Sequence, residues 1–324
     1  AMAEALSEVG QAAVLLGNAA SMHPAFSTLR ALAVLVADLS GAKLGFLSDG
    51  ANSAGACLAG VLPHRGAAGQ ARDSAGLDAA QMLAQPRNNY LLVGLEPEVD
   101  CGNASAAYAA MHEAEFVVML TPSVTERMRE YADVLLPISC SAETSGTYVN
   151  CEGRWQSFTA AARAPGSSRP GWKVLRVLGN LLELGGFDQA SSEQVRDALR
   201  EQLGSVSADN TQFGDSVDYA YKGKDLQRIG ELPMYAVDGV VRRAQALQQT
   251  ADADVSCVRL NPADAARLGL AEGDKAVLDQ GGKHVELPVC IDQRIAEGAA
   301  WVAQGSEATL VLGAPYDALR IKKV

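Results

Sequence analysis

Seven residues in the middle of the chain lie close enough in sequence to form one polar site. They follow a short apolar segment and are Glu143, Gly146, Thr147, Asn150, Glu152, Gly153 and Arg154. Thr147 and Asn150 supply a hydroxyl and an amide, and Glu152 and Arg154 can pair with each other or hold a polar ligand. The two glycines permit positive φ and a close approach of backbone to a ligand. The segment predicts either a site for a polar ligand or a buried polar network that braces an irregular loop.

The cysteines and histidines do not predict a metal site. The six cysteines are Cys57, Cys101, Cys140, Cys151, Cys257 and Cys290, and no two of them form a C-x-x-C pair. Iron–sulfur and zinc sites usually take short-spaced thiolates, so that one loop presents two ligands. The four histidines form neither H-x-x-x-H nor H-E-x-x-H, and no serine lies in G-x-S-x-G. We therefore expect no catalytic residue and no metal ligand, with most thiols free and buried.

The polar segment lies among alternating strand and helix patterns. Apolar runs typical of buried strands are residues 12–16, 43–47, 89–93, 116–120 and 134–136. Helix patterns cover residues 24–39, 105–113 and 122–132, and the first has an apolar face of Leu29, Leu32, Leu35, Val36 and Leu39. The alternation predicts a mainly parallel, doubly wound α/β sheet with ligands at the carboxyl ends of its strands.

The sequence changes character twice after this region. Two helices are predicted at 172–182 and from Ser191 to Gly204, and then residues 205–238 become polar and aperiodic. Further strands are predicted at 255–260, 275–279, 284–291, 299–303 and 309–312, with a helix that begins at Pro262. We expect an α/β domain at 1–204, a polar connector at 205–250 and a small β-barrel-like domain at 251–324.

Charge and hydropathy limit the classes of partner. The net charge is -11, with no cluster of Lys and Arg that would indicate nucleic acid. No apolar run reaches the roughly 18 residues that a membrane-spanning helix needs. The first residues also lack the basic and apolar regions of a secretory signal. The sequence predicts a cytoplasmic chain that binds no nucleic acid and does not insert into the membrane.

Two motifs resemble one family of oxidoreductases. Residues 132–154 contain A-D-V-x-L-P followed by E-x-x-G-T-x-x-N-x-E-G-R, and residues 260–274 join a helix to a Gly-Asp turn and a strand. Both are similar to the molybdopterin-dinucleotide oxidoreductases, which implies a formate dehydrogenase/DMSO reductase-like large domain followed by a truncated dinucleotide-binding-like barrel. In active relatives the first motif lies beside the pterin. The resemblance makes Gly146, Thr147, Asn150, Glu152, Gly153 and Arg154 pterin-pocket positions.

Other segments resemble one branch of that family. Residues 50–56 and 238–248 are similar to the G subunit of the bacterial NADH:quinone oxidoreductases (respiratory complex I). The resemblance implies a C-terminal scaffold fragment without its own redox centre, in which the pterin pocket is vestigial and molybdopterin is absent. Iron–sulfur clusters would lie in the N-terminal part of the same polypeptide. That part and other hydrophilic-arm subunits would be the partners, and the complex would hold the chain peripherally at the inner membrane.

Two alternatives remain open at this stage. The retained motif also fits a fragment of an active, formate dehydrogenase-like molybdopterin enzyme, and the pocket beside Arg154 could hold another small molecule. The loop that contains Glu96 and Glu98 bears on the choice. In relatives the corresponding loop approaches the nucleotide end of the cofactor, whereas these carboxylates would repel its phosphates.

Overall fold

The structure is a computed structural model that describes residue 6 and residues 11–48, 50–205 and 225–324. The chain forms two units, each assembled from separate stretches of sequence. The first unit draws its described residues from the ranges 1–76, 144–161 and 175–220. The second draws them from 77–143, 162–174 and 221–324. The chain passes from the second unit to the first within the predicted polar segment, between Glu143 and Thr144.

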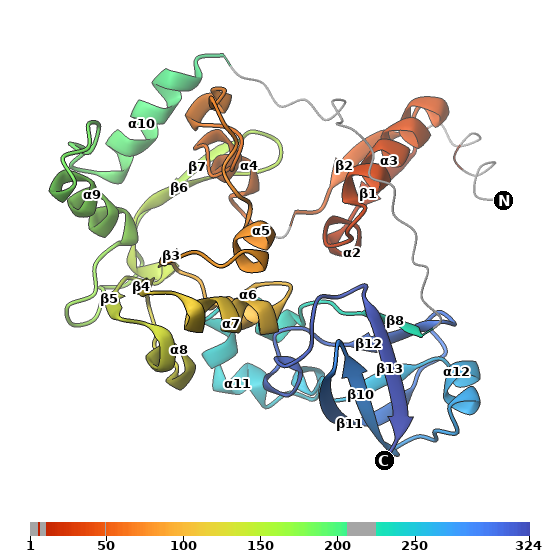
Figure 1. The fold of residues 1–324 in the computed structure, drawn as a ribbon. Helices are drawn as coiled ribbons and strands as arrows, with labels where there is room; N and C mark the ends of the chain where they lie inside the picture. The colour runs from red at the N-terminus through yellow and green to blue at the C-terminus, as the bar shows by residue number, and fades with distance from the viewer. Residues whose placement is uncertain (1–5, 7–10, 49, 206–224) are drawn as a thin grey trace. The chain divides into compact units, whose positions relative to one another are not determined.

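The first unit starts with a β–α–β arrangement (Figure 1). β1 (Ala13–Leu16) and β2 (Lys43–Phe46) are parallel neighbours, with α2 (Asn18–Ser21) and α3 (Phe26–Ser40) between them in sequence. Gly41 ends α3 with a φ of +71°, in the left-handed region that favours glycine. The predicted strands, helix and helix end are confirmed.

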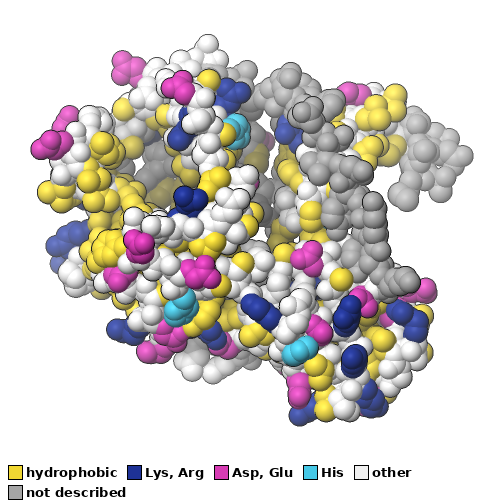
Figure 2. Space-filling view, viewed as in Figure 1, with side chains coloured by type: hydrophobic (Ala, Val, Ile, Leu, Met, Phe, Trp, Pro, Cys, Tyr) yellow, Lys and Arg dark blue, Asp and Glu magenta, His cyan; other side chains and the backbone are white. Residues whose placement is uncertain are grey.

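Two helices of this unit expose apolar side chains. In α3 the buried residues are Ala33, Val34 and Ala37, whereas three leucines of the predicted face are exposed: Leu32, Leu35 and Leu39. The apolar face that the sequence indicated is therefore largely exposed, and smaller side chains on another side of the helix are buried. α9 (Gly171–Leu181) exposes Val177 and Leu181, and hydrophobic side chains gather over this helix in Figure 2.

The rest of the first unit surrounds a β-hairpin. β6 (Gly146–Val149) and β7 (Trp155–Phe158) pair antiparallel. Near them lie α4 (Ser53–Leu58), the 3-10 turn η1 (Ala67–Gly69) and α10 (Ser192–Leu203). α10 begins as predicted at Ser191, whose Oγ accepts the backbone N–H of Gln194 at 3.3 Å.

The second unit contains a parallel sheet in the order β3 (Asn89–Val93), β4 (Phe116–Thr121), β5 (Val134–Pro137). Four of the helices of this unit fall between residues 77 and 143, the stretch that contains the sheet: α5 (Ala79–Ala84), α6 (Pro97–Asp100), α7 (Ala104–Glu113) and α8 (Glu126–Tyr131). The core between sheet and helices consists of Tyr90, Ala110, Met111, Val117, Met119, Met128 and Tyr131. The predicted strands and the helix at 105–113 are confirmed.

α8 begins later than the sequence predicted. Pro122 marked the expected start, but the helix starts at Glu126, after an N-cap at Thr125. The Thr125 Oγ1 accepts the backbone N–H of Met128 at 3.1 Å, which satisfies one of the unpaired donors of the first turn. A side-chain cap therefore sets this boundary, and not the proline.

The same unit contains a closed six-stranded barrel in the order β10-β11-β9-β12-β8-β13. The strands are β8 (Leu226–Ile229), β9 (Val258–Leu260), β10 (Lys275–Gln280), β11 (Lys283–Ile291), β12 (Ala299–Val302) and β13 (Ala318–Lys323). α12 (Pro262–Arg267) follows β9, and Asn261 caps it. Apolar side chains from all six strands, mostly leucine and valine, fill the centre. β10 and β11 pair antiparallel around a turn at Gly281–Gly282, so the strands predicted at 275–279 and 284–291 are confirmed.

Two features of the barrel differ from the sequence prediction. Residues 309–312 are not a strand, because Glu307–Thr309 forms a 3-10 turn and β13 lies further along the chain. β8 comes from the segment that we expected to be a polar connector, of which residues 206–224 lie outside the described residues. Four short helical segments occupy 234–253: Met234–Ala236, Val241–Arg243, Gln245–Gln248 and Ala251–Ala253.

The predicted class, an α/β fold with parallel strands followed by a β-barrel, is confirmed. The parallel strands of the α/β part form two sheets, one in each unit, and not a single sheet. Among the described residues, no helix combines the length and apolar character that a bilayer crossing requires.

Candidate functional site

The E-x-x-G-T-x-x-N-x-E-G-R motif forms the β6–β7 hairpin of the first unit. Gly146 lies opposite Phe158, and a Cβ at Gly146 would come within 2.9 Å of the Phe158 ring. Thr147 lies opposite Ser157, and their hydroxyl oxygens are 2.9 Å apart. Glycine and threonine at these positions are thus explained by contacts inside the hairpin.

The remaining motif residues form the turn that joins the two strands. The Asn150 Oδ1 accepts the backbone N–H groups of Glu152 and Arg154, at 3.1 and 3.0 Å. Gly153 has a φ of +76°. The Arg154 Nη2 and Glu152 Oε2 are 3.9 Å apart, and the side chains are 72% and 74% exposed. The buried polar network, one of the two alternatives for this segment, is therefore wrong for this pair, which lies at the surface.

Replacing Arg154 with alanine should barely change the stability of the chain. An exposed ion pair of this kind contributes less than about 1 kcal/mol, since water screens it and two long side chains must be ordered. Urea unfolding of the purified chain followed by circular dichroism measures the difference. A loss of several kcal/mol would show that Arg154 has a structural partner besides Glu152.

A cavity of about 740 Å³ lies beside the hairpin, at the carboxyl ends of β1 and β2. Parallel sheets commonly bind ligands at this position. Its described lining residues are Leu16, Ser21, Phe26, Arg30, Phe46, Leu47, Ser48, Gly50, Ala51, Asn52, Ser53, Ala54, Cys57, Tyr148 and Cys151. None of the six predicted pterin-pocket positions is among them, although their neighbours Tyr148 and Cys151 are.

Asn52 connects the cavity wall to the motif. Its Oδ1 accepts the backbone N–H of Val149 at 2.8 Å, and a Cβ at Gly55 would overlap the Asn52 amide. The Ser53 Oγ and the Cys151 Sγ are 3.8 Å apart. The 50–56 segment, noted in the sequence only for its resemblance, thus supports the hairpin directly.

The walls of this cavity are mostly apolar or small. The basic side chain among its described lining residues is Arg30, whose guanidinium lies 5.7 Å from the centre of the Phe46 ring. Cys57 and Cys151 contribute thiols that are exposed. The expectation that most thiols are buried is wrong, because Cys257 alone among the six is buried. The described residues contain no group of three or more potential metal ligands.

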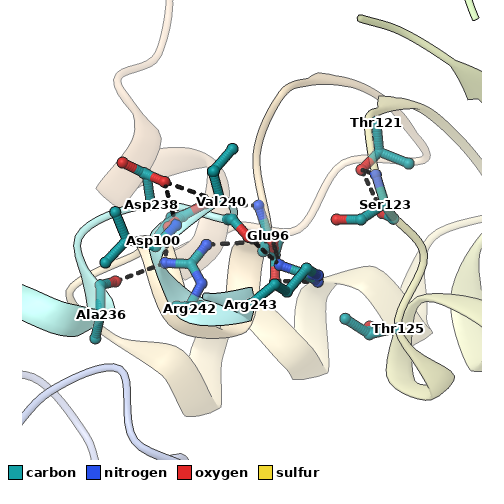
Figure 3. A network of polar contacts seen from close by, with 12 residues as sticks. Glu96, Asp100, Thr121, Ser123, Thr125, Ala236, Asp238, Val240, Arg242 and Arg243 are labelled. Carbon is teal, nitrogen blue, oxygen red and sulfur yellow. Dashed lines mark hydrogen bonds and ion pairs between the residues drawn. The ribbon is translucent and has the colours of Figure 1, made fainter. Parts of the chain in front are cut away.

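A second polar cluster lies in the second unit, at the loop between β3 and α6 (Figure 3). Two guanidiniums approach the Glu96 carboxylate. The Arg243 Nη1 lies 2.8 Å and the Arg242 Nη2 lies 3.3 Å from its Oε1. The Arg242 Nη1 also lies 3.0 Å from the Asp100 Oδ1. The side chains of Glu96 and Arg242 are only 10% and 13% exposed. The sequence had indicated the acidic loop and the 238–248 segment separately, without signalling that they pair.

The next acid of the loop is also buried and bonded. Glu98 accepts a hydrogen bond from the Tyr131 hydroxyl at 2.9 Å. Burial and the nearby Glu98 carboxylate raise the pKa of Tyr131 well above its usual value. Burial, with Asp100 and Glu98 nearby, raises the pKa of the Cys101 thiol to about 11. These groups keep their protons at neutral pH, so Tyr131 remains a donor to Glu98.

Two family models match most of the chain. The model described as molybdopterin oxidoreductase matches residues 1–181, and that of the molydopterin dinucleotide binding domain matches residues 233–319. The chain belongs to the molybdopterin oxidoreductase family. The resemblance read from the two sequence motifs is thereby confirmed.

Curated relatives of this molybdopterin oxidoreductase family member are named for different activities. The G subunit of the NADH-quinone oxidoreductase of Mycobacterium tuberculosis is 28% identical over 311 residues, which cover 86% of this chain and 37% of the relative. The F420-dependent formate dehydrogenase 2 subunit alpha of Methanococcus maripaludis is 22% identical over 255 residues, covering 65% and 37%. This chain spans little more than a third of the length of these relatives.

Among solved structures, acetylene hydratase from Pelobacter acetylenicus matches with a TM-score of 0.49 and 14% identity. The match covers 75% of this chain and 41% of that structure.

The family cofactor can be tested against the residues present. A dinucleotide carries a diphosphate, which proteins usually hold with guanidinium or ammonium groups and with free backbone N–H donors. In the first unit the motif amide and hydroxyls bond within the hairpin, and the described cavity lining offers Arg30 as its basic side chain. In the second unit Arg242 and Arg243 are paired with carboxylates. Neither this cavity nor this arginine cluster, as the structure describes them, therefore fits the diphosphate of such a cofactor.

Proposed function

We propose that the chain is the C-terminal scaffold region of the G subunit of a NADH:quinone oxidoreductase. In this role it supports electron transfer from NADH to quinone without a redox centre of its own. The M. tuberculosis relative that bears this name aligns with 86% of the chain, which supports the assignment. The 50–56 and 238–248 segments add to it, because each supplies contacts that hold the fold together: Asn52 on β6, and Arg242 and Arg243 on Glu96.

The use of the motif's polar groups within the hairpin is the observation that carries the proposal. Asn150 bonds to the turn backbone, Thr147 lies against Ser157, and Arg154 pairs at the surface. We infer that six motif residues are vestigial pterin-pocket positions whose contacts now lie within the hairpin: Gly146, Thr147, Asn150, Glu152, Gly153 and Arg154. No catalytic residue is proposed in this chain, and molybdopterin is proposed to be absent.

The proposed partners follow from the length of the relatives. The M. tuberculosis relative is nearly three times as long as its matched part, so a longer polypeptide can carry the iron–sulfur clusters. We propose contacts with that N-terminal part and with other subunits of the hydrophilic arm, on the cytoplasmic side and peripheral to the inner membrane. The exposed apolar residues of α3 and α9 support such contacts, because apolar surface of this kind commonly marks a protein interface.

Metal analysis of the natural complex tests this proposal. The chain is tagged in its own organism, purified with whatever co-purifies, and measured for molybdenum, tungsten and iron per polypeptide. We expect iron, substoichiometric molybdenum and tungsten, and NADH:quinone oxidoreductase subunits in the same preparation. One molybdenum or tungsten per chain would contradict the scaffold role.

The retained motif favours one alternative, an active molybdopterin enzyme of formate dehydrogenase type. The formate dehydrogenase relative supports this reading at 22% identity. The same preparation distinguishes the two functions, since formate-dependent reduction of an artificial electron acceptor together with stoichiometric metal is expected only for the alternative.

A further inference from the structure

Two neighbouring arginines in the second unit converge on one carboxylate. The Arg243 Nη1 and Nη2 approach the two oxygens of Glu96 at 2.8 and 3.3 Å, and the Arg242 Nη2 approaches its Oε1 at 3.3 Å. This is a two-pronged guanidinium–carboxylate contact with a second guanidinium added. The geometry suits any planar or tetrahedral oxyanion of similar size.

Other groups hold both guanidiniums in place independently of Glu96. The Arg242 Nη1 donates to the Ala236 carbonyl oxygen at 2.8 Å and contacts Asp100 at 3.0 Å. The Arg243 Nη1 donates to the Gly239 carbonyl oxygen at 2.8 Å. Figure 3 shows the guanidiniums pointing towards the Glu96 carboxylate from this segment. The two cations would therefore keep their positions if the carboxylate were removed.

The cluster is accessible from one side. A cavity of about 420 Å³ lies beside it, and its charged lining residues are Glu96, Glu98, Glu126, Arg127, Arg242, Arg243 and Glu307. Glycine at position 239 makes room for this pairing, since a Cβ there would lie 2.7 Å from the Glu96 Oε1. A volume of this size is within the range of small-molecule sites.

Two carboxylates are in direct contact with the two guanidiniums. Glu96 and Asp100 offset Arg242 and Arg243, so no net positive charge remains for a further anion. We propose that Arg242 and Arg243 form an anion site that the chain fills with its own Glu96 carboxylate. External phosphate groups reach the two guanidiniums only when that carboxylate is displaced.

The placement of the residues suggests the class of ligand that is excluded. The arginines lie in the stretch that matches a dinucleotide-binding domain model, whereas Glu96 lies in the stretch that matches the oxidoreductase model. A carboxylate from the oxidoreductase-model stretch therefore pairs with the guanidiniums of the dinucleotide-binding stretch. The site would accept diphosphate-like anions, and the native chain is closed to them.

Removing the Glu96 carboxylate tests the proposal directly. The Glu96→Ala variant of the full chain is titrated with inorganic pyrophosphate by isothermal calorimetry, beside the native chain. We expect binding at least about tenfold tighter than that of the native chain, since two guanidiniums become available for charge-assisted bonds. Adding Arg243→Ala to Glu96→Ala should abolish the gain.

Glu126→Ala is the matched control, because it removes the same charge from the same cavity at a side chain that is 94% exposed. An equal gain in this control would refute the proposal, as would native binding as tight as in Glu96→Ala or no gain in a folded Glu96→Ala. If Glu96→Ala does not fold, Glu96→Gln replaces it. Pyrophosphate should then raise the Tm of Glu96→Gln more than that of the native chain, and an equal or smaller rise would also refute the proposal.

Discussion

Replacing Arg228 with methionine is expected to destabilise the barrel by about 2–4 kcal/mol, as each buried acceptor left without its donor costs roughly 1–3 kcal/mol. Arg228 lies on β8 and is only 2% exposed. Its guanidinium donates to the carbonyl oxygens of Gly313 at 2.7 Å and Ala303 at 3.3 Å, and to the Gln280 Oε1 at 3.1 Å. Urea unfolding followed by circular dichroism measures the loss.

The opposing effect is the removal of a desolvated charge. Burial lowers the pKa of Arg228 to about 10, so the folded state does bear a cost for holding the cation. Methionine relieves that cost but leaves two buried acceptors, the Gly313 carbonyl oxygen and the Gln280 Oε1, without this donor, whereas the Ala303 carbonyl oxygen keeps the Thr309 hydroxyl. We therefore expect the loss to dominate. Arg320→Met is the control, because this β13 arginine is 65% exposed and pairs with Asp225 at the surface. A neutral or stabilising Arg228→Met would show that desolvation outweighs the lost hydrogen bonds.

The Arg228 contacts also explain where the sequence prediction of the barrel failed. Leu310 and Leu312 are both buried, and they lie in the stretch 309–312 that we expected to be a strand. They lie instead in the connection between β12 and β13, which Arg228 and Thr309 bond through the Ala303 carbonyl oxygen. A local apolar pattern reports burial, but the donor that shapes this connection comes from 75 residues away in sequence. By contrast, strands such as β3 and β4 were predictable because each is a short, mostly apolar run that neighbouring residues in sequence are enough to identify.

In the candidate site, too, features set by neighbouring residues were predictable, whereas contacts between residues far apart in sequence were not. The motif spacing located the hairpin, since Asn150 and Gly153 reflect turn chemistry over a few residues. The partners of that hairpin were not predictable, because Asn52 reaches Val149 across 97 positions. The pairing of Arg243 with Glu96 across 147 positions is a further case. Residue types at these positions suggested polar chemistry, while the fold alone determines which charges meet.

Gly60 has a backbone position that leaves no room for a side chain. Its φ is +79°, and a Cβ there would overlap backbone atoms of Gly66 and Ala67, with the Gly66 carbonyl oxygen at 2.8 Å. The Val61 backbone N–H donates to the Ala56 carbonyl oxygen at 3.0 Å, so the close approach of the Gly60 and Gly66–Ala67 backbones lies directly after α4. α4 supplies Ser53, Ala54 and Cys57 to the wall of the 740 Å³ cavity. The close approach at Gly60 therefore helps to define that wall.

Gly60→Ala is expected to destabilise the first unit by about 2–5 kcal/mol, from roughly 1–2 kcal/mol for the left-handed conformation and about 1–3 kcal/mol for overpacking. Backbone atoms cannot rotate away as a side chain can, so the loop at 66–67 must move and α4 with it. Gly41→Ala separates the two effects, because Gly41 has a φ of +71° and a Cβ added there would have no atom within 4 Å. The Gly41→Ala control should lose only the roughly 1–2 kcal/mol of stability that the left-handed conformation costs. Urea unfolding of both variants, with thiol labelling of Cys57 to follow the cavity wall, measures the difference, and equal losses would mean that the chain accommodates the clash without moving α4.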